Sequence, residues 1–359
     1  MDETLGRRGK GEGGYEPVTD MPYLSLQAVT KEFSSALAVR EVSLAIQQGE
    51  FVALLGPSGC GKSTLLRLIA GLEEPSAGTI VLGGKDLAGL APQQRGIGLV
   101  FQNYALFPHM TVAQNVGYGL EGKGLAKAEI SARVNRMLDV VRLSQRRDTM
   151  VTTLSGGEQQ RVAVGRAMVV EPVVLLFDEP LSNLDVALRQ ETREEIRALQ
   201  RRTGITTLYV THDQAEAMSL ADRIAVMRAG QLEQVGPPDQ LYNHPASEFV
   251  AQFLGGANLL PVNGEVSIPA LLRDKAGDGG IVAVKPEAIV ISSVDDISAQ
   301  AALVLDREYL GFTTSLLVKM VSTKLRVIAM TRELPMDVRP GQRVGFTIDW
   351  SHAIAFPRR

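Results

Sequence analysis

The segment from Phe51 to Thr64 constrains the fold more than any other part of this sequence. A short apolar run, Phe51–Leu55, leads directly into the nine letters GPSGCGKST, residues 56–64. These match the pattern G-x-x-x-x-G-K-[ST] in the strand-to-helix context that the pattern requires. Glycine-rich backbone can turn consecutive N–H groups toward a phosphate, and the following helix adds its positive end. The segment therefore predicts a phosphate-binding loop beyond the end of a buried parallel strand.

Each polar group of this loop has an expected partner on a nucleotide. Lys62 should reach the β- and γ-phosphates, and the hydroxyl of Ser63 should bind Mg²⁺, a small hard ion that needs few protein oxygens. The alternative is an ordinary glycine turn that matches by chance. We expect the whole loop to contact the nucleotide: Gly56, Pro57, Ser58, Gly59, Cys60, Gly61, Lys62, Ser63 and Thr64.

A second apolar run, Val173–Phe177, ends in the acids Asp178 and Glu179. Such a pair is often only a helix cap or a surface pair. Downstream of a phosphate-binding loop, it predicts that Asp178 holds Mg²⁺ through water. Glu179, one residue further, is predicted to act as the general base toward the attacking water.

Between these motifs lies LSGGEQQR, residues 154–161. Ser155 with the amides of Gly156 and Gly157 can form a second phosphate site at a helix start. A serine-capped helix alone would explain Ser155 but not two consecutive glycines. The segment closely resembles the signature of the ABC ATPases, and the remaining motifs of that family follow in order.

The resemblance assigns four further site residues. Gln102 falls at the Q-loop, whose glutamine in this family senses Mg²⁺ and the γ-phosphate, and residues 182–185 match the D-loop, whose Asp185 lies near the partner subunit. His212 matches the switch histidine that contacts the γ-phosphate; a lone histidine is otherwise usually a surface or core residue. Phe33 resembles the aromatic residue on which adenine stacks, with a core position as the alternative.

Composition limits the class of protein. The chain has 359 residues, a formal net charge of −3 and a pI near 5.9, which excludes the basic footprint of a typical nucleic-acid binder. No run approaches the roughly 20 apolar residues that cross a bilayer. The single cysteine, Cys60, allows no intrachain disulfide, and the sequence starts without a secretion signal, so a reducing cytoplasm is expected.

Patterning predicts a flexible, glycine- and charge-rich tail over residues 1–22, an α/β cassette over 23–256 with a helical subdomain at about 103–170, and a small β-barrel over 257–359. The fold class is thus an ABC-type P-loop cassette with a mixed, largely parallel sheet, followed by an all-β domain of the TOBE/OB type. Expected strands are Phe51–Leu55, Val173–Phe177 and Thr206–Val210 in the cassette, then Gly280–Val284, Ala302–Leu305, Thr314–Met320, Lys324–Ala329 and Val344–Ile348. Expected helices are Ala126–Val141, Gln159–Val170 and Val186–Arg202, the last capped by Asp185.

The last hundred residues resemble the regulatory barrel of importer ATPases at three short motifs: residues 285–287, 309–311 and 341–344. Where relatives usually have Arg-Pro-Glu, this chain has Lys285, which keeps the charge but loses the bidentate fork and so weakens an anion-binding role. The barrel could sense substrate, contact the other subunit or steady the dimer.

The resemblance also implies partners. In this family the signature of one subunit closes over the ATP of another, so this chain is expected to form a homodimer with two composite sites. The apolar loop 104–112, with Leu106, Phe107 and Met110, is expected to dock one of two transmembrane permease subunits unless those side chains are core. The importer would be fed by an extracytoplasmic solute-binding protein and would place this chain at the cytoplasmic face of the inner membrane.

Other family members remain as alternatives. A non-transport ABC protein that acts as a mechanical module usually carries two cassettes or a long coiled coil, and neither occurs here. An exporter ATPase is disfavoured by the barrel. Within importers, the chain looks most like the ferric-ion, 2-aminoethylphosphonate and polyamine group.

Two residues depart from the usual family pattern. Glu158 stands where many relatives have glutamine, and we expect little functional effect because the helix dipole tolerates a negative charge there. Cys60 is interpreted as a small filler of the phosphate loop. A thiol at that place also predicts that alkylation blocks ATP binding.

Overall fold

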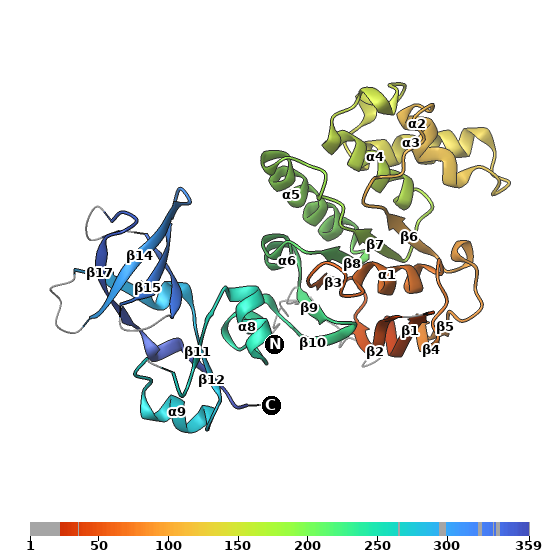
Figure 1. The fold of residues 1–359 in the computed structure, drawn as a ribbon. Coiled ribbons are helices and arrows are strands. Elements are labelled where there is room, and N and C mark those ends of the chain that lie inside the picture. The colour runs from red at the N-terminus through yellow and green to blue at the C-terminus, as the bar shows by residue number, and fades with distance from the viewer. Residues whose placement is uncertain are drawn as a thin grey trace, which may run out of the picture.

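The computed structural model describes residues 22–34, 36–264, 266–293, 299–321, 325–332, 334 and 338–358. The flexible tail predicted over residues 1–22 therefore lies, apart from its last residue, outside the described part. Figure 1 shows a large α/β body and a smaller β body that are joined through the segment around helix α8 (Glu248–Gly255).

A six-stranded sheet forms the centre of the large body. Its neighbours pair in parallel except for the antiparallel edge pair β10–β9. Every residue of β3 and of β8 is buried, as expected for central strands covered on both faces. The strand order is β10 (Gln231–Gly236), β9 (Arg223–Arg228), β3 (Phe51–Leu55), β8 (Thr206–Thr211), β7 (Val174–Asp178) and β6 (Ile97–Val100).

A second, antiparallel sheet packs on the other side of helix α1 (Lys62–Ala70). The apolar side chains of α1 share one core with residues of both sheets, such as Leu24 of this sheet and Val52 of β3. The helix that begins at the phosphate loop is thus fixed from two sides. The strand order is β2 (Ala36–Ile46), β1 (Leu24–Phe33), β4 (Ala77–Leu82) and β5 (Lys85–Asp86).

A helical part, uppermost in Figure 1, has its own apolar core with Val116, Leu138 and Val162. It contains α2 (Val112–Gly117), α3 (Lys127–Val140) and α4 (Gly156–Met168). The prediction for α3 is close, but the prediction for α4 began too late, at Gln159. Its two leading glycines are weak helix formers, yet a capping box at Ser155 starts the helix before them.

The other helices of the large body follow its strands. Asp185 caps α5 as predicted, because its carboxylate accepts a hydrogen bond from the Leu188 amide at 2.9 Å. Within the described residues, no helix is both long and apolar enough to cross a bilayer. These helices are α5 (Val186–Thr203), α6 (Gln214–Leu220) and α7 (Pro238–Asn243), and short 3₁₀ turns lie at Pro92–Gln94, Tyr118–Leu120, Ser144–Arg146 and Val151–Thr153.

The smaller body consists of two antiparallel sheets around one apolar core, with α9 (Ala270–Ala276) beside them. The burial of β15 alternates residue by residue, which explains why its prediction was accurate at both ends. The predicted strand Ala302–Leu305 is part of the longer β14, whose outer end is exposed, and α9 was not predicted. The first sheet has the order β11 (Asn258–Pro261), β12 (Ile281–Val284) and β18 (Ile354–Phe356). The second has the order β13 (Ile289–Ser292), β17 (Arg343–Ile348), β14 (Gln300–Tyr309), β15 (Thr314–Met320) and β16 (Arg326–Thr331). Short 3₁₀ turns lie at Pro286–Ala288 and Trp350–His352.

The Lys-Pro-Glu motif lies at the junction of the two bodies. The hydroxyl of Tyr242, on α7, donates to the carboxylate of Glu287 at 2.8 Å, and Lys285 Nζ lies 3.8 Å from the centre of the Tyr242 ring. Lys285 Nζ also donates to Asn243 Oδ1 at 2.9 Å. Burial, followed by the nearby Glu287, raises the pKa of Tyr242 to about 12. The motif thus connects the β body to the cassette. Its charged residues, Lys285 and Glu287, have protein partners here, so no bound anion is needed to explain them.

Candidate functional site

The phosphate loop between β3 and α1 has the backbone that its glycines predict. Gly59 and Gly61 adopt positive φ values of 77° and 102°. A Cβ on Gly61 would lie 2.2 Å from the Ala38 carbonyl oxygen, and one on Gly56 would lie 2.3 Å from the Met227 carbonyl oxygen. Residues with side chains are therefore excluded at positions 56 and 61 by backbone that cannot move aside.

Lys62 lies across this loop and is only 4% exposed. Its Nζ donates to the carbonyl oxygens of Gly56 at 2.8 Å and Pro57 at 3.0 Å. Among the described ion pairs, none joins Lys62 to a carboxylate. A buried ammonium with only neutral partners attracts an anion, and a phosphate group is the complement that this loop fits.

Ser63 and Asp178 meet although they are far apart in sequence. The Ser63 hydroxyl donates to Asp178 Oδ1 at 2.8 Å, which brings the first turn of α1 to the end of β7. Burial raises the pKa of Asp178, and the negative charge of Glu179 adds to this, while the Ser63 hydrogen bond opposes it. Two hard oxygen donors side by side fit Mg²⁺, and a divalent cation would keep Asp178 ionised.

Glu179 and His212 also meet at the carboxyl ends of neighbouring strands. Asp178 pairs with Val210 in the parallel ladder, so Glu179, one residue after Asp178, and His212, two residues after Val210, leave the sheet at the same edge. Glu179 Oε2 lies 2.9 Å from His212 Nδ1, and the Glu179 amide donates to the Val210 carbonyl at 3.0 Å. Glu179 has a positive φ of 43°, an unusual backbone conformation for a residue with a side chain.

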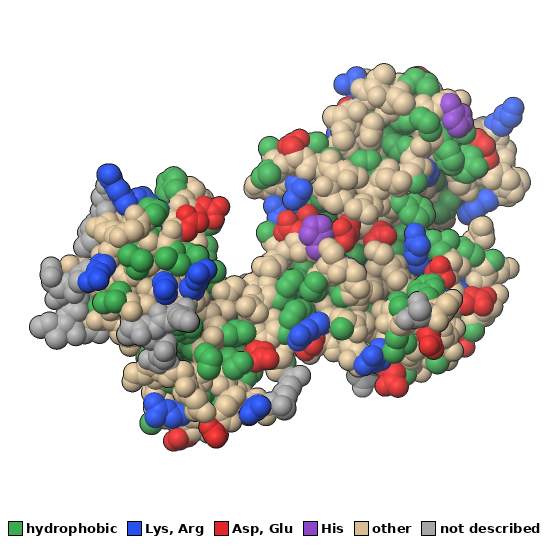
Figure 2. All heavy atoms as spheres, in the orientation of Figure 1, with side chains coloured by type: hydrophobic (Ala, Val, Ile, Leu, Met, Phe, Trp, Pro, Cys, Tyr) green, Lys and Arg blue, Asp and Glu red, His purple; other side chains and the backbone are tan. Residues whose placement is uncertain are grey.

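Sequence reasoning missed Glu216, which anchors the backbone around His212. Its carboxylate is 3% exposed and accepts hydrogen bonds from the hydroxyls of Tyr209 at 2.9 Å and Thr211 at 2.8 Å. Burial raises the pKa of Glu216, while the two hydrogen bonds lower it by less. In Figure 2, acidic, basic and histidine side chains gather in the middle of the cassette, at the level of β8 and α6 in Figure 1.

Gln102 joins this cluster through a chain of hydrogen bonds. Its Nε2 donates to the Ser182 hydroxyl at 3.2 Å, and that hydroxyl donates to the Glu179 carbonyl at 3.0 Å. Asn183 Nδ2 donates to the Gln102 carbonyl at 3.0 Å. The Q-loop and D-loop motifs thus contact each other and the backbone of Glu179. A displacement of Gln102 would therefore alter the hydrogen bonds that position the Glu179 backbone.

Ser155 caps α4, and Glu158 completes the cap. Glu158 Oε2 accepts from the Ser155 amide at 2.9 Å, and the Glu158 amide donates to the Ser155 hydroxyl at 3.3 Å. The backbone hydrogen bond from Ser155 lowers the pKa of Glu158, and Arg146 also contributes. The spacing S-x-x-E is a known cap signal, so this role was available in the sequence.

The signature glycines have a packing role as well. A Cβ on Gly156 would lie 2.7 Å from Leu184 Cδ2, and one on Gly157 would lie 2.9 Å from Leu188 Cδ1. They let α4 approach the start of α5 closely. Within the described hydrogen bonds, none links Ser155 to the phosphate loop, and Figure 1 shows α4 in the upper part of the cassette, apart from α1.

Phe33 lies at the end of β1 and is 42% exposed, which does not fit a core position. Lys31 Nζ lies 4.9 Å from the centre of its ring. An exposed ring at the end of a strand can offer a flat face to an aromatic base.

The apolar loop after Gln102 is half-buried rather than freely exposed. Leu106, Phe107 and Met110 are all of intermediate burial, and the Phe107 ring lies 4.4 Å from the ring of Tyr118. The fully buried Asn115 fixes the loop, because it accepts from the Phe107 amide at 2.9 Å and donates back to the Phe107 carbonyl at 3.1 Å. The loop is held in one shape with part of its apolar surface in solvent.

Known proteins share both bodies. Residues 39–182 match the family model "ABC transporter", and residues 282–356 match "TOBE domain". The chain is 48% identical over 302 residues to the Fe(3+) ions import ATP-binding protein FbpC of Escherichia coli K12, which covers 82% of this chain and 86% of that protein. The chain belongs to the family of ABC transporter ATP-binding proteins.

Two further comparisons agree with this assignment. The spermidine/putrescine import ATP-binding protein PotA of Thermobifida fusca is 46% identical over 323 residues, covering 84% of each chain. The structure of cbiO1 from Clostridium perfringens, described as part of the ABC transporter complex cbiONQ, superposes with a TM-score of 0.58 at 30% identity and covers 62% of this chain and 91% of that one. The fold class predicted from the sequence is confirmed, and as an ABC transporter ATP-binding protein the chain is an ATPase.

In this ABC ATPase, Cys60 should react slowly with iodoacetamide. The side chain is 5% exposed, and burial raises the pKa of its thiol, although Lys62, 3.9 Å away, opposes this. Since the thiolate is the reactive form, labelling near neutral pH should be at least about tenfold slower than in denatured protein and should speed up as pH rises. Mass spectrometry at timed intervals measures the rate.

Protein labelled at Cys60 should no longer bind ATP, because the adduct would occupy space inside the phosphate loop. The test is nucleotide binding by protein shown to be fully labelled at Cys60. Full ATP affinity in that sample would contradict the prediction, and fast labelling in the folded protein would contradict the burial argument.

Proposed function

We propose that this chain is the ATP-hydrolysing subunit of a bacterial importer and that it acts as a homodimer. The observation that carries the proposal is the division of the site. Lys62, Ser63, Glu179 and His212 converge at one end of the central sheet, whereas Ser155 heads a helix in another part of the cassette. Each copy then supplies half of two composite sites across a two-fold axis.

The roles of this chain's own residues follow from their positions. Lys62 and the loop amides hold the β- and γ-phosphates, and Phe33 supports the adenine. Ser63 and Asp178, with Gln102, would hold Mg²⁺, which supplies charge neutralisation on the phosphates when bound. Glu179 orients the attacking water and takes up its proton, while His212 fixes the Glu179 carboxylate and faces the γ-phosphate.

Work on a membrane partner requires that the partner bind the open and closed dimers with different free energy. We place the contact for two permease subunits at the half-exposed loop that contains Leu106, Phe107 and Met110. The chain would then lie at the cytoplasmic face of the inner membrane, and an extracytoplasmic solute-binding protein would deliver the cargo. The boundary between cassette and β domain falls at residue 256 in this proposal.

Ferric ion or a polyamine is the proposed cargo. The names of the Escherichia coli and Thermobifida fusca relatives support these two, and 2-aminoethylphosphonate is the third candidate from the sequence. A relative from Jannaschia sp., 47% identical over 305 residues, is a sn-glycerol-3-phosphate import ATP-binding protein. Similarity to relatives therefore supports more than one cargo.

The experiment is uptake by proteoliposomes that contain this chain with its permease subunits and the matching binding protein. Radioactive ferric ion and spermidine are supplied in parallel, with ATP on the side of the cassette. We expect ATP-dependent uptake of one cargo, absent in a matched preparation with Glu179→Gln. ATP hydrolysis by an assembled complex without uptake of either cargo would reject ferric ion and spermidine as cargo, and the same result with 2-aminoethylphosphonate and sn-glycerol-3-phosphate would reject the importer proposal.

A further inference from the structure

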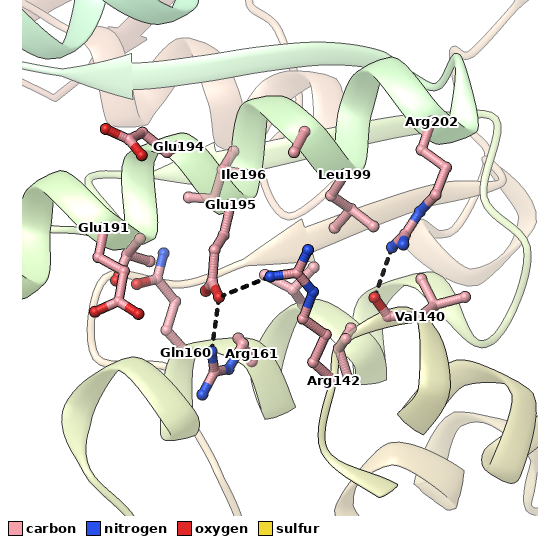
Figure 3. A pocket seen from close by; sticks show the side chains of 14 residues that line it. Val140, Arg142, Gln160, Arg161, Glu191, Glu194, Glu195, Ile196, Leu199 and Arg202 are labelled. Atoms are coloured by element: carbon pink, nitrogen blue, oxygen red, sulfur yellow. Dashed lines mark hydrogen bonds and ion pairs between the residues drawn. The ribbon is translucent and has the colours of Figure 1, made fainter.

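A cavity lies between α4, α5 and the end of α3, and none of the predicted nucleotide-site residues lines it. Its volume is about 530 Å³, which falls within the roughly 300–1,000 Å³ of small-molecule sites. Figure 3 shows side chains of α4 and α5 facing each other across it. The cavity is therefore a separate feature of the cassette.

The cavity results from the way α4 and α5 meet. At the first turn of α4, Gly156 packs on Leu184, just before α5, and Gly157 packs on Leu188 of α5. An added Cβ would lie 2.7 Å or 2.9 Å from a methyl carbon of these leucines, which would have to shift. Further along, the same two helices are separated by the cavity, which is lined by Gln160 and Val164 from α4 and by Thr192 and Leu199 from α5. The pair of helices is closed at one end and open at the other.

Gln160 is the residue that points to a ligand. Its side chain rises from α4 toward α5 in Figure 3, and the residue is only 1% exposed. Neither its Oε1 nor its Nε2 has a hydrogen-bond partner among the described residues. A buried amide with both groups unpartnered is costly. It matches a partner that offers one N–H and one C=O side by side.

The charges around the cavity balance. Arg161 pairs with Glu195 at 2.8 Å, and Arg142 lies 3.9 Å from the same carboxylate. Arg202 donates to the Val140 carbonyl at 2.6 Å. Three arginines and three glutamates line the cavity in total, so it favours an uncharged guest: Arg142, Arg161, Arg202, Glu191, Glu194 and Glu195. Val140, Val164 and Leu199 give it apolar walls that suit a flat molecule.

We propose that this cavity binds a small, uncharged, flat molecule with an amide edge, such as a lactam or a pyrimidine, and that the bound molecule regulates ATP hydrolysis. The Gln160 amide, shielded in this structure, turns into the cavity when the guest binds and pairs with the N–H and C=O of the guest. Because Ser155 and Asp185 cap the starts of α4 and α5, a guest wedged between the helices changes the relative position of these two motifs. The regulatory part rests on the proposed function, whereas the binding part does not.

The test uses 5-fluorouracil as the probe and follows its ¹⁹F signal as the full chain is added, with saturating ATP present to fill the nucleotide site. A fragment of this size should bind saturably with a Kd on the order of 1 mM. Gln160→Leu should weaken binding at least about tenfold. The matched control is Gln190→Leu, since Gln190 lies on the exposed side of α5 outside the cavity and its loss should change nothing.

Val164→Phe, which fills the cavity, is a second variant, and thermal unfolding shows whether each protein is folded. No saturable shift with wild-type protein, or equal binding by Gln160→Leu, would overturn the site. Saturating probe should change the ATPase rate of wild type at least about twofold and leave Gln160→Leu unchanged. An unchanged wild-type rate at saturation would overturn the regulatory role while leaving the proposed importer function untouched.

Discussion

Replacing Glu179 by glutamine should lower ATP turnover at least about a hundredfold while ATP affinity stays within about threefold of wild type. A positioned general base contributes roughly 10²–10⁴ in rate, and glutamine keeps the volume of the side chain but cannot take up a proton. Glu179 lies at the end of β7, 2.9 Å from His212, and makes no contact with the phosphate loop among the described hydrogen bonds. Phosphate release and binding of a fluorescent ATP analogue measure the two quantities.

The variant should also accumulate as an ATP-bound dimer, because closure no longer leads to hydrolysis. Size-exclusion chromatography with and without ATP tests this. Glu121→Gln is a suitable control, since Glu121 is exposed and far from the strand ends in sequence. Turnover by Glu179→Gln at the wild-type rate would show that Glu179 is not the base.

The strand ends of the central sheet were predictable because two independent signals coincide there. Fully apolar runs such as Phe51–Leu55 identify buried parallel strands, and the polar residues directly after them must lie at one edge of the sheet. The spacing G-x-x-x-x-G-K-S then fixes the loop. The structure adds a reason for Gly56 and Gly61, namely the nearby carbonyls of Met227 and Ala38.

Long-range polar contacts were not predictable in the same way. Glu216 and Asn115 look like ordinary helix residues in the sequence, and only the fold brings Glu216 against Tyr209 and Thr211, or Asn115 under Phe107. Buried polar groups depend on partners that a local pattern does not contain. The predicted helix range Gln159–Val170 leaves out the first turn of α4, although the signature motif indicates a helix start at Ser155, because Gly156 and Gly157 are weak helix formers.

The signature glycines show how a packing role and a ligand role can coincide. Two consecutive glycines predict a phosphate site, yet Gly156 and Gly157 also allow the close contact of α4 with Leu184 and Leu188, whose methyl groups would have to shift for an added Cβ. The close contact fixes the start of α4 on α5, so that the amides at its first turn are held in place. Preorganised amides are what a site for a partner's nucleotide needs.

Replacing Lys62 by alanine should weaken ATP binding itself, by at least about tenfold, because hydrogen bonds to charged groups contribute about 1.5–3 kcal/mol. Lys62 is 4% exposed and bonds to the Gly56 and Pro57 carbonyls, so alanine also removes two contacts within the loop. Lys62→Met also removes the ammonium group and its two hydrogen bonds but keeps most of the apolar stem, so the comparison of the two variants isolates the contribution of side-chain packing.

Both variants should bind ATP weakly if the charge of Lys62 is what holds the phosphates, and Lys62→Met should unfold at a higher temperature than Lys62→Ala. Lys85→Ala, in the exposed strand β5, is the control and should bind ATP like wild type. Isothermal titration with ATP gives the affinities. Because Glu179→Gln is expected to keep ATP and lose turnover, the two positions should separate binding from chemistry. Undiminished affinity in Lys62→Met would instead place the phosphates outside this loop.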